Sequence, residues 1–211
     1  MVDVRAGLGV ITPWSAGSGH VGPVRSREVA TLAGMRTLLP DPPPAEFEAL
    51  LERRRRSGAD LHDEVWEGVV HMTPAPRGRH DDVQQQLAEL LGPPARRAGL
   101  LPTIGGFNLG EPDDYRVPDG GLRRRRVDAA YYRTAALVVE VVSPGDETWH
   151  KLAFYAAHNV DELLIVNPEE RTVDWLALRE GRYEPTDRSR LVELGPADVA
   201  AQIDWPPIGT E

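Results

Sequence analysis

The sequence predicts a mixed α/β fold, in which a central mixed β-sheet is flanked by α-helices. Two observations predict it. Apolar stripes with helical spacing alternate along the chain with short β-branched runs, and the strongest run, residues 136–142, is aliphatic at every position but one. The length of 211 residues and the hydrophobic content of 41% are typical of a soluble protein with one well-packed core.

Residues 1–44 contain much Gly, Pro and Ser and show no sustained periodicity, so we expect a flexible N-terminal leader. The folded domain is expected to span residues 45–211, because apolar periodicity begins with Phe47, Leu50 and Leu51.

The pattern predicts helices at 45–56, from 79 to Pro93 and Pro94, and at 147–158. It predicts a strand or hairpin at 64–72, with Gly68 at a turn or bulge, and strands at 100–109, 117–122, 136–142, 162–166 and 172–178 before a turn-rich tail. The helices are predicted from apolar residues three and four apart, such as Val83, Leu87 and Leu91. The strands are predicted from β-branched runs bounded by Gly, Pro and Asn. Proline lacks the N–H that a helix interior needs, so the second helix is expected to end there.

Composition excludes several classes of protein. The net charge of -9, from 24 basic and 33 acidic residues, argues against binding nucleic acid through bulk electrostatics, although a local basic groove remains open. The absence of cysteine excludes disulfide scaffolds, thiol nucleophiles and Cys-ligated metals, so any metal must be bound by oxygen or imidazole. No apolar run reaches the roughly 18 residues that span a membrane, and we expect a cytoplasmic protein with no membrane partner.

Two acids occupy unusual places. Glu140 lies within the aliphatic run, where a buried carboxylate must neutralise, pair or bind a metal unless the strand end reaches solvent. Asp119 lies in a Val-Pro-Asp-Gly-Gly segment that, taken alone, predicts a turn. An acid at the end of one strand and an acid inside the next strand can converge on a hard cation such as Mg²⁺.

Lys151 is the only lysine among the 24 basic residues, and it begins the helix that follows Glu140. A helix folded back over the strand could bring its compact ammonium to the two acids. The alternative is an exposed ion pair with Glu147, four residues earlier.

Several motifs, taken together and in order, resemble the Uma-type bacterial endonuclease family of the PD-(D/E)XK restriction-endonuclease-like superfamily. These motifs are Glu64 with Gly68, residues 72–76 before His80, Tyr-Arg-Val-Pro-Asp at 115–119, Val-Glu-Val-Val-Ser-Pro at 139–144, Lys151 with Tyr155, and residues 160–168. The resemblance spans about residues 45 to 185 and leaves the leader uncovered.

The resemblance implies a restriction-endonuclease-like core and a Mg²⁺ or Mn²⁺ site that hydrolyses phosphodiester bonds in DNA. By position it implies that Asp119, Glu140 and the Val141 carbonyl are metal ligands. It implies that Glu64 is a further ligand or an orienter of a second metal or water. Lys151 matches the lysine of the family, and His80 is expected to contact the acids or a substrate phosphate. One departure concerns the lysine: the superfamily places it two residues after the glutamate, where this chain has Val142, so Lys151 must supply it. For His80, an exposed place at a helix start is the alternative.

The leading hypothesis is therefore a metal-dependent DNA endonuclease in which two carboxylates and a lysine activate a water. The alternatives are a catalytically silent module of the same fold that binds nucleic acid or protein, and a hydrolase of small phosphate esters. Arg123 to Arg126 could contact phosphates beside the site or form a solvated loop. Exposed sheet edges favour a homodimer, which would suit double-strand cleavage.

Overall fold

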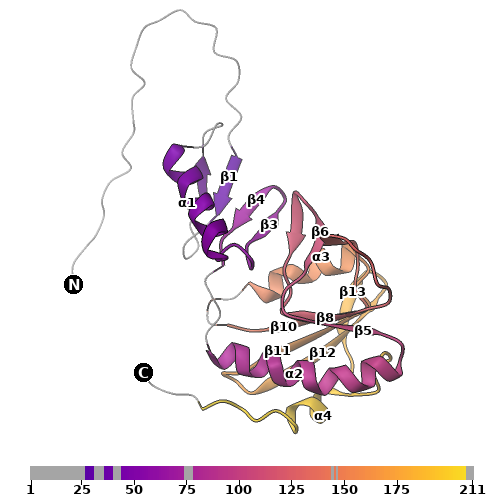
Figure 1. Ribbon diagram of the computed structural model, residues 1–211. Helices are drawn as coiled ribbons and strands as arrows, with labels where there is room; N and C mark the ends of the chain where they lie inside the picture. The colour runs from indigo at the N-terminus through magenta and orange to yellow at the C-terminus, as the bar shows by residue number, and fades with distance from the viewer. Residues whose placement is uncertain are drawn as a thin grey trace, which may run out of the picture.

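The structure, a computed structural model, describes residues 27–30, 36–39, 44–73, 78–143, 145 and 147–207 (Figure 1). The helical elements are α1 (Ala45–Ser57), α2 (Gly78–Arg97), the 3₁₀ turn η1 (Thr148–Lys151), α3 (Leu152–Ala157) and α4 (Pro196–Ala200). The strands are β1 (Arg27–Ala30), β2 (Arg36–Leu39), β3 (Glu64–Trp66), β4 (Val69–His71), β5 (Leu101–Ile104), β6 (Asn108–Glu111), β7 (Asp114–Arg116), β8 (Gly120–Arg123), β9 (Tyr131–Tyr132), β10 (Leu137–Val141), β11 (Glu162–Asn167), β12 (Thr172–Arg179) and β13 (Arg182–Pro185).

The strands form two mixed sheets and one separate hairpin. A six-stranded sheet has the order β13-β12-β11-β10-β8-β5, and its β10 and β11 run parallel. A five-stranded sheet has the order β4-β3-β7-β6-β9, and β1 pairs with β2. The predicted mixed α/β class is thus confirmed, with a second sheet that the sequence pattern did not indicate.

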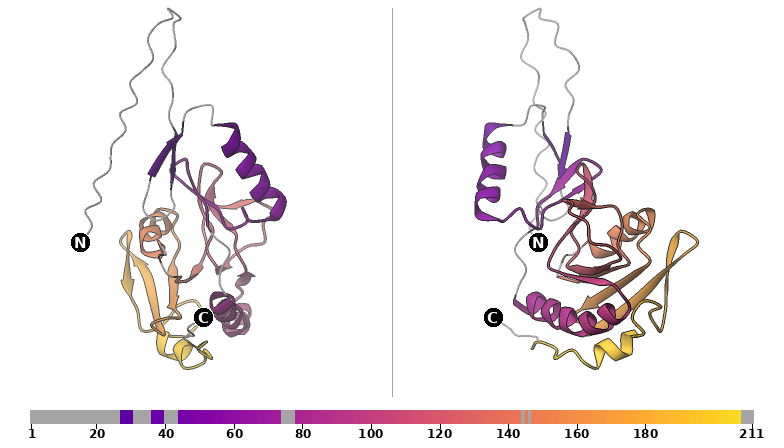
Figure 2. Two further views of the ribbon diagram at one scale, coloured as in Figure 1. Left: turned by 90° about the vertical axis from the view of Figure 1, so that its left-hand side faces the viewer. Right: turned by 45° about the vertical axis from the view of Figure 1, so that its right-hand side comes forward.

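The six-stranded sheet is covered on both faces. Helices α2 and α4 lie on one face, whereas α3 and the five-stranded sheet lie on the other (Figures 1 and 2). Side chains alternate along β10, and Leu137, Val139 and Val141 pack in the core beneath α2. Val138 packs in the core beneath α3. Glu140 faces this second core, where it contacts Tyr155.

Among the described residues, no helix is long and apolar enough to cross a membrane.

Most predicted elements are found within a few residues of their expected bounds. The first helix, the hairpin at Gly68, the long aliphatic strand and the two strands after the third helix are all present. Strands β1 and β2 lie inside the expected leader, residues 1–44, most of which lies outside the described residues.

Two boundaries were predicted wrongly in the middle of the chain. Helix α2 continues through Pro93 and Pro94, because Leu91 and Ala95 are buried in the same core as the earlier turns of the helix. The strand expected at 100–109 is two strands in different sheets, since Gly105 adopts a φ of 77° that turns the chain between β5 and β6.

Three further differences affect the site or the tail. Strand β8 begins at Gly120, so Asp119 immediately precedes it. The third helix opens as the 3₁₀ turn η1, in which residues three apart align and both Thr148 and Lys151 are buried. The tail contains β13 and α4 rather than turns alone.

Candidate active site

Asp119 and Glu140 lie on neighbouring strands, as the sequence predicts. Strands β8 and β10 pair antiparallel with Gly120 opposite Val139, which brings the preceding residue, Asp119, beside Glu140. The backbone N–H of Val141 donates a hydrogen bond of 2.7 Å to Oδ2 of Asp119. The contact from Val141 to Asp119 thus uses its N–H, and the ligand role of its carbonyl oxygen stays a prediction.

Glu140 is buried and hydrogen-bonded, so the alternative in which it reaches solvent is wrong. Its side chain has a relative exposure of 4%. The Tyr155 hydroxyl donates to its Oε1, and Nζ of Lys151 lies 3.3 Å from both carboxylate oxygens. Lys151 and Tyr155 reach Glu140 together because they are four residues apart, one helical turn.

Lys151 contacts a second acid, Glu64, instead of pairing with Glu147. Its Nζ lies 3.0 Å from Oε1 of Glu64, whereas Oε2 of Glu147 lies 3.3 Å from Nδ1 of His71. Glu64 belongs to β3 of the five-stranded sheet and Glu140 to β10 of the six-stranded sheet. The lysine therefore joins acids from two sheets.

Glu64 accepts hydrogen bonds from several protein donors. Nε1 of Trp66 donates to its Oε2 at 2.7 Å, and the backbone N–H of Val117 donates to its Oε1 at 2.8 Å. Together with Lys151, these donors engage both oxygens of a buried carboxylate. This arrangement fits the role of an orienter of Lys151, and a role of Glu64 as a further metal ligand stays a prediction.

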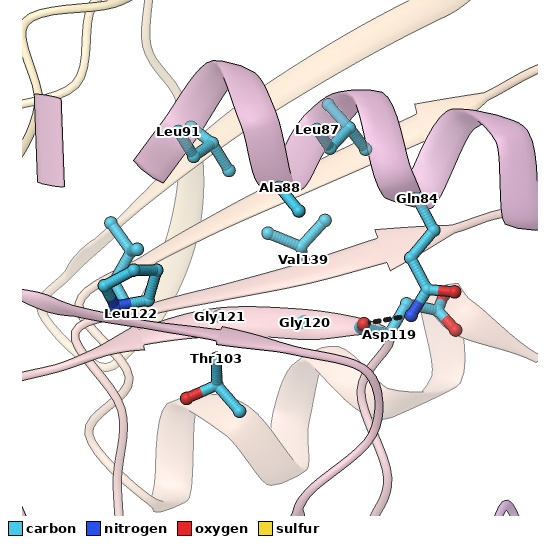
Figure 3. A pocket seen from close by; sticks show the side chains of 11 residues that line it. Gln84, Leu87, Ala88, Leu91, Thr103, Asp119, Gly120, Gly121, Leu122 and Val139 are labelled. Atoms are coloured by element: carbon cyan, nitrogen blue, oxygen red, sulfur yellow. Dashed lines mark hydrogen bonds between the residues drawn. The ribbon is translucent and has the colours of Figure 1, made fainter. Parts of the chain in front are cut away.

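Helix α2 contacts Asp119 through two side chains. Nε2 of His80 lies 3.1 Å from Oδ1 of Asp119, and His80 is buried rather than on the surface. Gln84, one turn later, donates to the backbone carbonyl of Asp119 (Figure 3). Figure 3 also shows the side chains that line a small pocket between α2 and the six-stranded sheet, with Asp119 among them and Ala88 of α2 over Val139.

The electrostatics of the site reflect an excess of buried negative charge. Burial raises the pKa of the Glu140 carboxyl to about 8; the Lys151 charge opposes this, and the Asp119 and Glu64 charges add to it. Burial likewise raises the pKa of Tyr155, so its hydroxyl keeps its proton and donates to Glu140. Burial lowers the pKa of His80, but the Asp119 and Asp81 carboxylates together outweigh this and raise it above the usual value.

Whether the site fits a metal ion depends on how its carboxylates are grouped and on the chemistry of their oxygen atoms. Among the described residues, no group of three His, Asp or Glu side chains is already close enough to bind one. The donor chemistry nevertheless fits a hard divalent cation, because Asp119 and Glu140 offer carboxylate oxygens whose charges repel one another. A cation between them would relieve this repulsion.

The basic run lies away from these acids. Arg123 ends the strand that Asp119 precedes, and its Nε donates to Oγ1 of Thr103. Nη2 of Arg124 lies 2.5 Å from Oδ2 of Asp161. The two arginines contact neighbouring side chains at the end of β8 opposite Asp119, which favours the alternative of a solvated loop over phosphate contacts beside the site.

Sequence reasoning missed Trp66, Gln84 and Arg116 as residues around the site. Trp66 follows Glu64 by two positions and therefore shares its side of the strand, a signal that was present. Gln84 follows His80 by one helical turn. Arg116 had no such signal, because its neighbours are set by the pairing of β3 with β7.

Comparison with known proteins identifies the family. The model of the Uma2 family, described as "Putative restriction endonuclease", matches residues 44–203. This chain belongs to the Uma2 family. A putative nuclease belonging to DUF820 from Anabaena variabilis ATCC 29413, known from a crystal structure, shares the fold with a TM-score of 0.55 and 16% identity, over 66% of this chain and 90% of that one. No curated protein matches the chain.

Membership of the Uma2 family confirms the resemblance drawn from the motifs, and the shared structure confirms the nuclease-like fold. Family and fold together support a nuclease role in general. Proteins with the restriction-endonuclease-like fold generally use divalent metal ions.

Proposed function

We propose that the protein is a metal-dependent endonuclease that hydrolyses phosphodiester bonds in DNA. The observation that carries the proposal is that Asp119 lies beside Glu140, and that Lys151 contacts both Glu140 and, from the other sheet, Glu64. A structural core does not need three acids and a lysine gathered in one place, whereas phosphodiester hydrolysis needs both negative ligands and a positive group.

Each of these residues has a role in the proposed reaction. Asp119 and Glu140, with the carbonyl of Val141, would bind Mg²⁺ or Mn²⁺, which supplies Lewis acidity and lowers the pKa of a bound water. Lys151 orients the attacking water and offsets the negative charge that develops on the phosphate. Glu64 fixes the direction of the Lys151 ammonium. His80 and the Val141 N–H fix the two oxygens of Asp119.

One observation keeps a second function open. Lys151 already balances part of the charge of Glu64 and Glu140, and no group of three potential ligands is assembled within the described part of the chain. A catalytically silent module that binds nucleic acid or protein would keep this arrangement without ever binding a metal.

A cleavage assay separates the two functions. Supercoiled and linear duplex DNA, single-stranded DNA, RNA and a small phosphate diester are incubated with the protein in Mg²⁺, Mn²⁺ or EDTA. We expect metal-dependent DNA cleavage that Asp119→Asn and Glu140→Gln reduce at least about 100-fold. The matched control is Glu162→Gln, a buried acid that contacts Trp175 and Ser189 away from the site. DNA binding without any metal-dependent cleavage would favour the silent module.

The proposal includes a homodimer. Strands β5 and β13 form the two edges of the six-stranded sheet and offer unpaired backbone groups for a second copy. Light scattering of the purified protein, with and without DNA, gives the mass that tests this part.

A further inference from the structure

Arg116, the last residue of β7, is buried although arginine side chains are normally solvated. Its Nη1 donates to the Val65 carbonyl at 2.9 Å, to Oδ1 of Asp114 at 2.9 Å and to the Tyr115 carbonyl at 3.2 Å. Its Nε is buried with no hydrogen-bond partner among the described residues. A buried guanidinium with an unmet donor is a poor choice for stability alone, so its position needs another explanation.

The guanidinium lies over two aromatic rings. Its Cζ lies 4.3 Å from the centre of the Trp66 ring and 4.0 Å from the centre of the Phe154 ring. Trp66 also stacks on His71, with ring centres 4.3 Å apart and an interplanar angle of 17°. The planar, delocalised charge of arginine suits such stacking, which lysine cannot reproduce.

Each of the two rings is directly connected to the candidate site. Trp66 donates its Nε1 hydrogen bond to Glu64. Phe154 belongs to α3, next to Tyr155, which bonds Glu140, and three residues after Lys151. Arg116 therefore links the strand that carries Glu64 to the helical segment that carries Lys151.

The ring of Phe154 also lies close to the hairpin of β6 and β7. Gly110 of β6 has a φ of 126°, and a Cβ added there would clash with the carbonyl oxygen of Asp114 and lie 2.9 Å from Cζ of Phe154. The hairpin backbone therefore already requires glycine at this position, and the glycine also leaves room for the ring. Phe154 thus approaches the strand that pairs with β7, which carries Arg116.

We propose that Arg116 is a positioning residue: by clamping Trp66 against Phe154, it holds Glu64 in contact with Lys151. Its effect on catalysis rests on the proposed nuclease function. Its effect on the geometry does not, because the Glu64–Lys151 contact exists whether or not the protein cleaves DNA.

The single lysine of the chain makes the test direct. Protein labelled with ¹³C and ¹⁵N in lysine only, without a lysine-containing tag, gives one set of lysine side-chain NMR signals, that of Lys151. We expect Arg116→Met to shift this signal and to broaden it. Arg116→Lys keeps the charge but loses the planar stack, and should not restore the native signal.

Two more variants complete the design. Trp66→Phe keeps a ring for stacking but removes the Nε1 donor to Glu64, so it should also shift the Lys151 signal. Arg123→Met is the matched control, since Arg123 also lies over an aromatic ring, at 4.3 Å from the centre of Tyr132, at the far end of β8. It should leave the Lys151 signal unchanged.

In the cleavage assay, we expect Arg116→Met to lower kcat at least about 10-fold with little change in KM, because substrate contacts remain. Native Lys151 signals in folded Arg116→Met would overturn the proposal. If Arg116→Met does not fold, an unchanged signal in Trp66→Phe overturns it instead. A wild type that cleaves no DNA would refute the nuclease function, whereas the NMR comparison would still decide the role of Arg116.

Discussion

The ammonium of Lys151 lies 3.0 Å from Oε1 of Glu64, an acid that enters the site from a different sheet than Glu140. Lys151 also lies 3.3 Å from Oε2 of Glu140. One buried cation therefore balances two buried acids. Changes at Lys151 or Glu140 should alter stability in ways that depend on pH, because Glu140 has a raised pKa.

Removing the ammonium of Lys151 leaves the buried carboxylates of Glu64 and Glu140 without their shared positive partner. We expect Lys151→Met to lower the free energy of unfolding by about 3 kcal/mol, the usual scale for breaking a buried ion pair. The loss should be larger at pH 9 than at pH 6, because Glu140, with a pKa of about 8, is then ionised in the folded wild type and needs its partner. Urea unfolding at both pH values measures the difference. An equal loss at both pH values would contradict the coupling.

Glu140 itself should make the stability fall with rising pH. Its pKa in the folded state is raised from 4.5 to about 8, so between these values the folded protein holds a proton that the unfolded chain has released. Stability from this group is therefore lost as pH rises from about 5 to 8. We expect Glu140→Gln to flatten that part of the profile, measured by denaturation in EDTA. Parallel profiles for variant and wild type would refute this account.

The contribution of His80 to the free energy of unfolding should also depend on pH. Its pKa is raised above the usual 6.5 because the Asp119 and Asp81 carboxylates together outweigh the effect of burial. Its contribution is fully present below the unfolded pKa and is lost as pH rises through the folded pKa. Hence His80→Gln should destabilise the metal-free protein more at pH 5.5 than at pH 8.5. The reverse order in thermal unfolding would show that the imidazole does not pair with Asp119 as described.

Glu162 provides a contrast, because it is a buried acid with a purely structural set of partners. It accepts hydrogen bonds from Nε1 of Trp175 at 2.9 Å, Oγ of Ser189 at 2.6 Å and the N–H of Arg190 at 2.8 Å. Glu162→Ala should cost about 3 kcal/mol by leaving buried donors without an acceptor. Calorimetry should show unchanged metal binding in this variant at a temperature where it stays folded. Loss of metal binding in this variant would mean that removing any buried acid abolishes metal binding, whether or not the acid lies at the proposed site.

Much of this site was predictable from the sequence. Asp119 and Glu140 stood out because proline and glycine flank one and aliphatic residues surround the other, and Lys151 stood out as the single lysine. The parts that escaped prediction depend on tertiary packing. Arg116 meets Trp66 only because β3 pairs with β7, a contact between strands far apart in the chain.

The fold, like the site, has parts that the sequence predicted and parts that depend on tertiary packing. The aliphatic pattern of β10 predicted its burial, which the structure shows at all five positions of the strand. The proline pair in α2 predicted a helix end that does not exist, since burial of Leu91 and Ala95 outweighs the missing backbone hydrogen bonds. Local propensity was overruled where long-range packing was strongest.

The central claim is that Asp119 and Glu140 bind one divalent metal ion, and titration calorimetry with Mg²⁺ or Mn²⁺ tests it most directly. We expect the wild type to bind the ion and folded Asp119→Ala and Glu140→Ala to lose it. Glu64→Gln should still bind, because Glu64 orients Lys151 instead of contacting the metal. Equal behaviour of the wild type and the two alanine variants would contradict the claim and make Glu140 a structural acid.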